Sequence, residues 1–211
     1  MKEKEKVNHI CKSLMNGELG NSKLSKEILA YTGQSSYKIR HYLNNLMEFP
    51  DINYLEIGVL YGSTFISSLY KNDLNSAYAI DIDFTKQFNA ITTKLDLKFE
   101  KFEQDCFTLD LSKIKHKINV YLYDGGHTFE FQKAALEYFY PILDDTFIFL
   151  CDDWFMDDMH DHNDPYRFVE QGTRSAIKDM NFKTLFEDER YGYANNPYTW
   201  WNGYYTALLQ K

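Results

Sequence analysis

The sequence predicts a doubly wound α/β domain with a mostly parallel, seven-stranded sheet. Two patterns lead to this fold class. From Asp51 onward, short apolar runs alternate with amphipathic segments, which is typical of a parallel sheet buried on both faces. Near the end of the chain, apolar runs at 182–186 and 204–209 flank the turn-rich stretch 192–203. This arrangement indicates a hairpin and therefore an antiparallel last strand.

The periodicity places each element of this fold. Strands are expected at 54–57, 77–80, 97–102, 118–123, 147–151, 182–186 and 204–209. Helices are expected at 63–72, 84–95, 107–115, 128–139 and 172–180. Because crossovers between parallel strands are right-handed, these helices should cover both faces of the sheet.

The first fifty residues predict an N-terminal helical cap, and residues 51–211 form the main domain. Ser35 or Ser36 can cap a helix that ends before Pro50. The apolar face of this helix carries Ile39, Tyr42, Leu43, Leu46 and Met47. Since the preceding segment is polar, we expect residues 1–20 to be peripheral.

The composition is that of an ordinary soluble protein and disfavours several function classes. Of 211 residues, 44% are hydrophobic and 26% are charged. The formal net charge of −8 makes nucleic acid and membrane surfaces poor partners, and no apolar run is long enough to span a bilayer. Scattered cysteines and the lack of a signal peptide predict a cytoplasmic protein. The sequence leaves open whether the protein forms a homodimer.

The first strand ends in a glycine-rich turn, Glu56-Ile-Gly58-Val-Leu-Tyr-Gly62-Ser63. Ligands of such sheets bind at the carboxyl ends of the strands. Gly58 permits close approach of a ligand, and Gly62 with Ser63 opens a helix whose free N–H groups face the same crevice. The spacing is not that of a dinucleotide site, and the carboxylate of Glu56 suits a ligand with an amino group. A turn that needs glycine only for its geometry is the alternative.

The second and third strands end in acidic residues. Asp81 is placed to accept hydrogen bonds from both hydroxyls of a ribose, and Asp83 to cap the next helix. Asp105 is placed to accept from the amine of adenine, while the backbone N–H of Cys106 meets a ring nitrogen. A helix N-cap is the alternative role for Asp105.

In order and spacing, these motifs resemble class I S-adenosylmethionine-dependent methyltransferases over residues 36–211. The segments YLEIGVLYGSTFISSL, YLYDGGHTFEFQKAALEYFYPIL and FIFLCDDWF are similar to the small bacterial macrocin O-methyltransferase type. The resemblance implies a Rossmann-like fold with S-adenosylmethionine as methyl donor and a small-molecule or sugar hydroxyl as acceptor. The residues it assigns to the cofactor are Glu56, Gly58, Gly62, Ser63, Asp81, Asp105 and Cys106.

Three carboxylates follow the fourth and fifth strands, in Asp124-Gly-Gly-His127 and in Asp152-Asp153-Trp154. Neighbouring parallel strands bring such ends together, where the carboxylates repel one another unless a cation neutralises them. Oxygen ligands suit Mg²⁺. The resemblance to metal-dependent O-methyltransferases implies that Asp124, Asp152 and Asp153 bind the ion. The alternative is that Asp124 begins a turn and that the Asp pair caps a loop.

His127 and Asp124 are both candidates for the catalytic base. A neutral imidazole can take the proton of an acceptor near pH 7, whereas the macrocin-type relatives imply Asp124, oriented by His127. Those relatives commonly have Asp-Gly-Asp-His, and this chain has Gly126 in place of the second Asp. A non-catalytic cofactor-binding module of the same fold is therefore an alternative. A nucleotide-binding oxidoreductase is a further one, which the missing GxGxxG motif disfavours.

Residues 144–164 contain eight Asp and neither Lys nor Arg. His160 and His162 lie among them, and we interpret the stretch as a solvated acidic lid rather than a second metal site. The candidates to line an acceptor pocket are Trp154, Phe155, Tyr166, Trp200 and Trp201, for which buried packing is the alternative.

Overall fold

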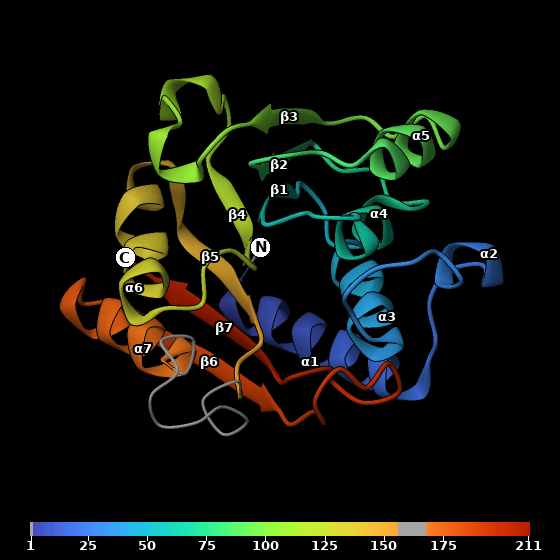
Figure 1. Cartoon of the computed structure of the whole chain (residues 1–211). Coiled ribbons are helices and arrows are strands. Elements are labelled where there is room, and N and C mark those ends of the chain that lie inside the picture. Colours follow the sequence, from blue (N-terminus) through green and yellow to red (C-terminus); the bar gives the residue numbers. More distant parts are fainter. Residues whose placement is uncertain (1, 156–167) are drawn as a thin grey trace.

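The computed structural model describes residues 2–155 and 168–211. In these ranges one sheet has the strand order β3-β2-β1-β4-β5-β7-β6 (Figure 1). β7 pairs antiparallel with β5 and β6, and the other neighbours are parallel, which confirms the predicted fold class. The strands are β1 (Asn53–Ile57), β2 (Ser76–Asp81), β3 (Glu100–Glu103), β4 (Ile118–Tyr123), β5 (Leu143–Asp152), β6 (Lys183–Arg190) and β7 (Tyr204–Gln210).

Helices cover both faces of the sheet (Figure 1). One face packs against α1 (Glu3–Leu19), α3 (Tyr37–Leu46), α4 (Ser63–Leu69) and α5 (Lys86–Lys94). The other packs against α6 (Phe129–Phe139) and α7 (Val169–Asp179). The shorter pieces are α2 (Lys26–Leu29) and the 3₁₀ turns η1 (Cys106–Thr108), η2 (Leu111–Lys113) and η3 (Tyr140–Ile142). None of the helices in the described ranges combines the length and the apolar character needed to cross a membrane.

Hydroxyl side chains cap four of the described helices, α2, α3, α5 and α6. Ser36 caps α3, where its Oγ accepts from the backbone N–H of Ile39, and this confirms one of the two predicted caps. Thr128 caps α6 in the same way. The predicted cap at Asp83 is wrong, because α5 begins at Lys86 and is capped by Thr85. The hydroxyl of Thr85 accepts the backbone N–H of Phe88 in the first turn of α5.

The predicted helix at 107–115 is also wrong. Two 3₁₀ turns occupy this stretch, and the extended backbone of Leu109 separates them. Asp105 and Asp110 each accept a hydrogen bond from an N–H two residues onward, at 2.9 and 3.0 Å. Such local bonds compete with the helical pattern, so the chain turns twice instead of forming one helix.

The expectation that residues 1–20 are peripheral is wrong. Ile10 and Leu14 of α1 are 0% and 1% exposed and belong to the same apolar core as α3 and the sheet. At Gly17 a β-carbon would lie 2.9 Å from the Cβ of Tyr42, so glycine lets α1 approach α3 closely. The buried stripe of α1 is narrow, which explains why its sequence looks polar.

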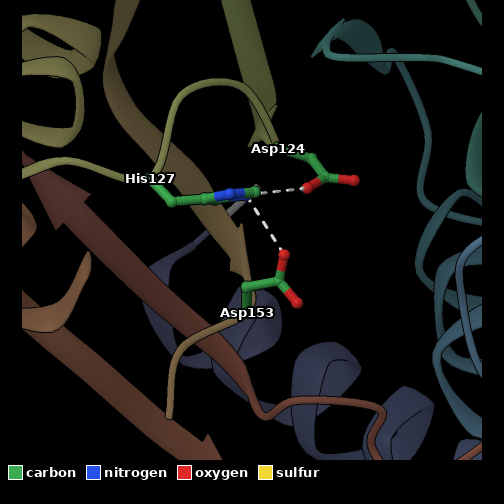
Figure 2. Close-up of side chains that lie close together, drawn as sticks. All are labelled: Asp124, His127 and Asp153. Carbon is green, nitrogen blue, oxygen red and sulfur yellow. Dashed lines mark ion pairs between the residues drawn. The ribbon is translucent and has the colours of Figure 1, made fainter. Parts of the chain in front are cut away.

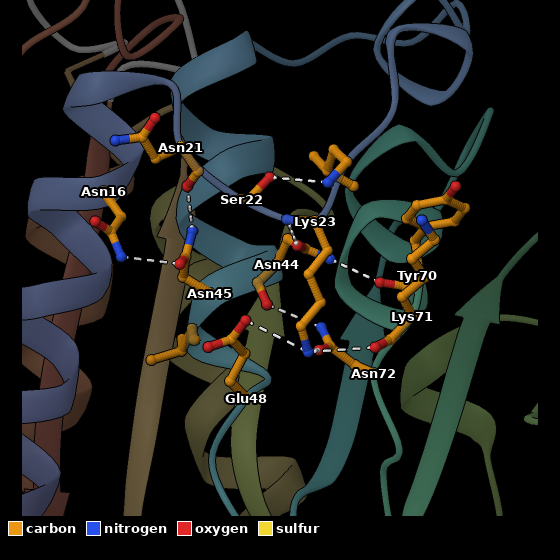
Figure 3. A network of polar contacts seen from close by, with 12 residues as sticks. Asn16, Asn21, Ser22, Lys23, Asn44, Asn45, Glu48, Tyr70, Lys71 and Asn72 are labelled. Carbon is orange, nitrogen blue, oxygen red and sulfur yellow. Dashed lines mark hydrogen bonds and ion pairs between the residues drawn. The ribbon is translucent and has the colours of Figure 1, made fainter.

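Asparagine side chains join the N-terminal helices to α4 (Figure 3). The amide of Asn45 accepts from Asn16 at 2.9 Å and donates to the carbonyl of Asn21 at 2.6 Å. The amide of Asn44 donates to the carbonyls of Ser67 and Tyr70. These bonds hold the N-terminal helices against the helix that follows the glycine-rich turn.

Candidate functional site

Two adjoining cavities open at the carboxyl ends of the strands, beside the point between β1 and β4 where the strand order reverses. The first, of about 230 Å³, has Ser63, Asp124, His127 and Asp153 in its wall. The second, of about 370 Å³, has Asp105 and Cys106. Gly58 and Asp81 line both. The predicted cofactor and metal residues thus converge on one region, with Glu56, Gly62 and Asp152 beneath it.

Both glycines of the first turn have a left-handed backbone that favours glycine. Gly58 has φ +81°, and a β-carbon there would lie 1.8 Å from the carbonyl oxygen of Asp124. Gly62 has φ +85° at the start of α4, where a β-carbon would lie 2.3 Å from the ring of Phe88. A side chain at either position would therefore push the turn away from β4 or from α5.

Glu56 lies behind this turn, although the sequence analysis placed it against a ligand. The residue is fully buried, and its carboxylate accepts hydrogen bonds from the hydroxyls of Tyr54 and of Thr64, the second at 2.6 Å. Burial raises the pKa of Glu56 to about 8. In this geometry the side chain holds the start of α4 in place.

Asp81 occupies the boundary between the two cavities. Its Oδ2 accepts the backbone N–H of Leu60 at 2.7 Å, which ties the glycine-rich turn to the end of β2. A carboxylate has about four acceptor sites, so capacity remains for a ligand. This position suits the predicted contact with a ribose.

Asp105 and Cys106 lie on the wall of the second cavity. Asp105 is exposed and caps η1, so its alternative role is present in the structure while one oxygen remains free of that bond. The thiol of Cys106 is half-buried, and burial raises its pKa to about 12. At neutral pH it is therefore an uncharged thiol.

Asp124, His127 and Asp153 gather in the first cavity (Figure 2). Asp124 follows β4, Asp153 follows β5, and His127 lies in the loop before α6. The Nε2 atom of His127 is 3.7 Å from Asp124 Oδ1 and 3.1 Å from Asp153 Oδ2. The three side chains each offer a metal-ligand atom, and these atoms lie within 4.8 Å of one another.

The charges of these three side chains affect one another. Burial raises the pKa of Asp124, and the nearby His127 opposes that shift. Burial by itself would lower the pKa of His127, but its ion pairs with Asp124 and Asp153 outweigh this effect and raise the pKa above its ordinary value. The imidazole is therefore held as a cation between two carboxylates, which differs from the neutral base that the sequence analysis considered.

The gathered set differs from the predicted one, because His127 takes the place of Asp152. Asp152 is 2% exposed, and its Oδ1 accepts the backbone N–H of Asp153 at 3.0 Å. It continues β5 opposite Tyr204, whereas Asp153 leaves the strand with a left-handed backbone (φ +57°). Successive residues point to opposite sides of a strand, so two adjacent Asp need not share one cluster.

Of the aromatic candidates, Trp201 lies in the wall of the first cavity. Trp154 and Trp200 belong to the two apolar cores, and Phe155 packs beside one of them. Gln34 also lines the first cavity, although the sequence indicated only a turn there. The predicted acidic lid is wrong for residues 144–152, which belong to β5, where Asp152 is buried. The rest of the predicted lid from residue 156 onward, with His160 and His162, and the pocket candidate Tyr166 lie outside the described residues.

Gly126, which stands in place of the second Asp of the Asp-Gly-Asp-His motif, lies against an aromatic side chain. A β-carbon at this position would lie 2.5 Å from the ring of Phe131. That ring stacks on Phe107, with centroids 5.9 Å apart, and both rings line the second cavity. An aromatic pair therefore occupies the space that a larger residue at 126 would need.

A family model described as a methyltransferase domain matches residues 55–154. Over this range the chain is similar to a methyltransferase domain, which supports the predicted class I S-adenosylmethionine-dependent methyltransferase. The matched range runs from β1 through Asp153 and contains most of both cavities. No curated protein matches the chain.

Solved structures of methyltransferases share the fold of this chain at low identity. An O-methyltransferase from Bacillus cereus in complex with S-adenosylhomocysteine is 14% identical, with a TM-score of 0.61 over 96% of this chain and 91% of that one. Magnesium protoporphyrin IX methyltransferase from Synechocystis PCC 6803 is 11% identical, with a TM-score of 0.58 over 98% and 97%. An N-methyltransferase from Bradyrhizobium japonicum WM9 is 10% identical, with a TM-score of 0.51 over 75% and 85%. The fold alone therefore does not specify the acceptor atom.

Proposed function

We propose that this enzyme transfers a methyl group from S-adenosylmethionine to a hydroxyl oxygen of a small molecule or sugar, with the help of a divalent cation. The cluster of Asp124, His127 and Asp153 beside the glycine-rich turn is the observation that carries the proposal. The choice of oxygen rests on the resemblance of the motifs at Asp124 and at Asp152-Asp153 to metal-dependent O-methyltransferases.

The two cavities suit the two halves of the donor. Asp81 at their boundary would accept from the ribose hydroxyls, which leaves the second cavity for the base and the first for the methionine part. The methyl group would then lie near Asp124 and Asp153. Transfer is an in-line displacement, so the main task of the protein is to orient donor and acceptor.

The donor set fits a divalent cation. Two carboxylates and one imidazole offer oxygen and nitrogen ligands, and this mixture suits Mn²⁺ as well as the predicted Mg²⁺. When bound, such an ion supplies a Lewis acid that lowers the pKa of an acceptor hydroxyl. Asp124 and Asp153 would hold the ion, and His127 would release its proton to join them.

Asp124 is the better supported of the two candidate bases. With an ion bound, the lone pair of His127 Nε2 would be a metal ligand and could not accept a proton, whereas Asp124 would keep a second carboxylate oxygen for this role. Its side chain lies in the same cavity as the predicted acceptor site. His127 would then hold the Asp124 carboxylate in position.

The test measures release of S-adenosylhomocysteine from S-adenosylmethionine with a panel of catechols and methyl glycosides. We expect turnover to need Mg²⁺ or Mn²⁺ and to stop with EDTA. Asp153→Asn should reduce turnover at least about 100-fold, because a removed ligand costs both charge and geometry. The affinity for S-adenosylhomocysteine should stay within about threefold, since the cofactor residues lie on other strands. Turnover that survives EDTA would contradict the metal-assisted mechanism.

Two matched variants complete this test. Asp145→Asn changes an exposed carboxylate near the start of β5 and should leave turnover unchanged. Asp152→Asn separates the predicted ligand set from the gathered one. A loss of Mn²⁺ affinity as large as that of Asp153→Asn would assign Asp152 to the ion, and a small loss would exclude Asp152 from the ligand set.

A further inference from the structure

One side chain from the segment before β7 reaches the acidic cluster. The amide nitrogen of Asn202 donates a hydrogen bond to Asp153 Oδ1 at 2.6 Å. Asn202 is 6% exposed, and 49 residues of sequence separate the two partners. The other oxygen of Asp153, Oδ2, faces His127 at 3.1 Å. Asn202 thus occupies one side of the carboxylate, and the cluster occupies the other.

The orientation of the Asn202 amide is determined by its two partners. Its Oδ1 accepts the backbone N–H of Asn195 at 2.8 Å, while its Nδ2 donates to Asp153. A backbone N–H can only donate, and an ionised carboxylate can only accept. A flipped amide would therefore lose both hydrogen bonds, so the side chain has one satisfied orientation.

The backbone beside Asn202 is held equally tightly. The N–H of Phe155 donates to the carbonyl of Asn202 at 2.9 Å, and the N–H of Trp154 donates to the carbonyl of Gly203 at 3.2 Å. A β-carbon at Gly203 would lie 2.5 Å from the ring of Phe155, which explains why glycine follows Asn202. The segment after Asp153 is therefore pinned from the β7 side.

Asp153 needs such support, because its backbone is left-handed (φ +57°). Asp tolerates this conformation better than most residues, but the surrounding contacts must maintain it. The end of β5 supplies one contact, from the N–H of Asp153 to the carboxylate of Asp152. Asn202 supplies a contact to the Asp153 carboxylate itself, at the oxygen that does not face His127.

We propose that Asn202 is a positioning residue that holds Oδ1 of Asp153 and thereby directs Oδ2 toward the ion shared with Asp124 and His127. This inference rests on the proposed metal-assisted function. Removal of a group that orients a metal ligand typically lowers metal affinity or activity by roughly 10- to 100-fold. We therefore expect Asn202→Ala to weaken Mn²⁺ binding by about that factor.

The experiment titrates Mn²⁺ by electron paramagnetic resonance and S-adenosylhomocysteine by calorimetry, each on the full chain. Asn202→Ala should lose about 10- to 100-fold in Mn²⁺ affinity while it keeps the wild-type affinity for S-adenosylhomocysteine. Retained cofactor affinity shows that the variant is folded. Asn202→Ser is a second variant for the same comparison, since a serine hydroxyl is too short to bridge Asn195 and Asp153.

Asn195→Gly is the matched control. It changes a neighbouring asparagine in the same segment but keeps the backbone N–H that Asn202 accepts, and glycine suits the φ of +52° at this position. Wild-type Mn²⁺ affinity in this control together with a loss in both Asn202 variants supports the inference. Equal Mn²⁺ affinities in the wild type and the three variants would overturn the positioning role of Asn202 but not the metal-assisted function. A wild-type protein that binds no Mn²⁺ would overturn both.

Discussion

Replacing Asp81 by asparagine should weaken the binding of S-adenosylhomocysteine with little change in overall shape. In the structure, Oδ2 of Asp81 accepts the N–H of Leu60 at 2.7 Å. Asparagine has one carbonyl oxygen, and this N–H requires it. The other position of the side chain then carries an NH₂ group, which donates where a ribose hydroxyl needs an acceptor.

The magnitude follows from these bonds. A hydrogen bond to a charged group contributes about 1.5–3 kcal/mol, against about 0.5–1.5 kcal/mol between neutral groups. Losing the bond to one ribose hydroxyl and weakening the bond to the other ribose hydroxyl costs about 2–4 kcal/mol of binding free energy. This corresponds to roughly a 30- to 1,000-fold increase in dissociation constant. Calorimetric titration of Asp81→Asn measures this change. Asp83→Asn, at an exposed position two residues away, is the control. A dissociation constant for Asp81→Asn within about threefold of the wild type would refute the assignment of Asp81 to the ribose.

Two further predictions concern stability. Because burial raises the pKa of Glu56 to about 8, above the ordinary value of 4.5, the neutral carboxyl stabilises the fold below pH 4.5, and this stability is lost as the pH rises through about 8. In urea unfolding, the free energy of unfolding of Glu56→Gln should therefore rise relative to that of the wild type between pH 5.5 and pH 8.5. A difference in unfolding free energy that does not change with pH would contradict the raised pKa of Glu56. Ile10→Ala in α1 should lower the free energy of unfolding by about 2–5 kcal/mol, because the side chain is fully buried. Met15→Ala, at 57% exposure, should change it by less than about 0.5 kcal/mol, and similar effects for the two would show that α1 is peripheral after all.

Local signals in the sequence predict the structure correctly where nearby residues decide it. The glycine-rich turn after β1 needs left-handed backbone at Gly58 and Gly62, and only glycine adopts it freely. The hydroxyl cap of α3 acts over three residues, so its neighbours reveal it. The same reasoning failed at 107–115, where Asp105 and Asp110 bond to their own loops and interrupt a helical pattern.

The α/β alternation, the glycine-rich turn and the acidic strand ends can be predicted from the sequence, because periodicity and turn chemistry act over a few residues. Which of these groups meet depends on the packing of distant segments. His127 joins Asp124 and Asp153, whereas Asp152 is not among the gathered ligand atoms, since the direction of a side chain at a strand end depends on how the backbone leaves the ladder. Asn202 reaches Asp153 across 49 residues, and α1 fills a face of the core with a narrow stripe. Contacts between such distant segments leave no local pattern, because packing, not sequence spacing, brings them together.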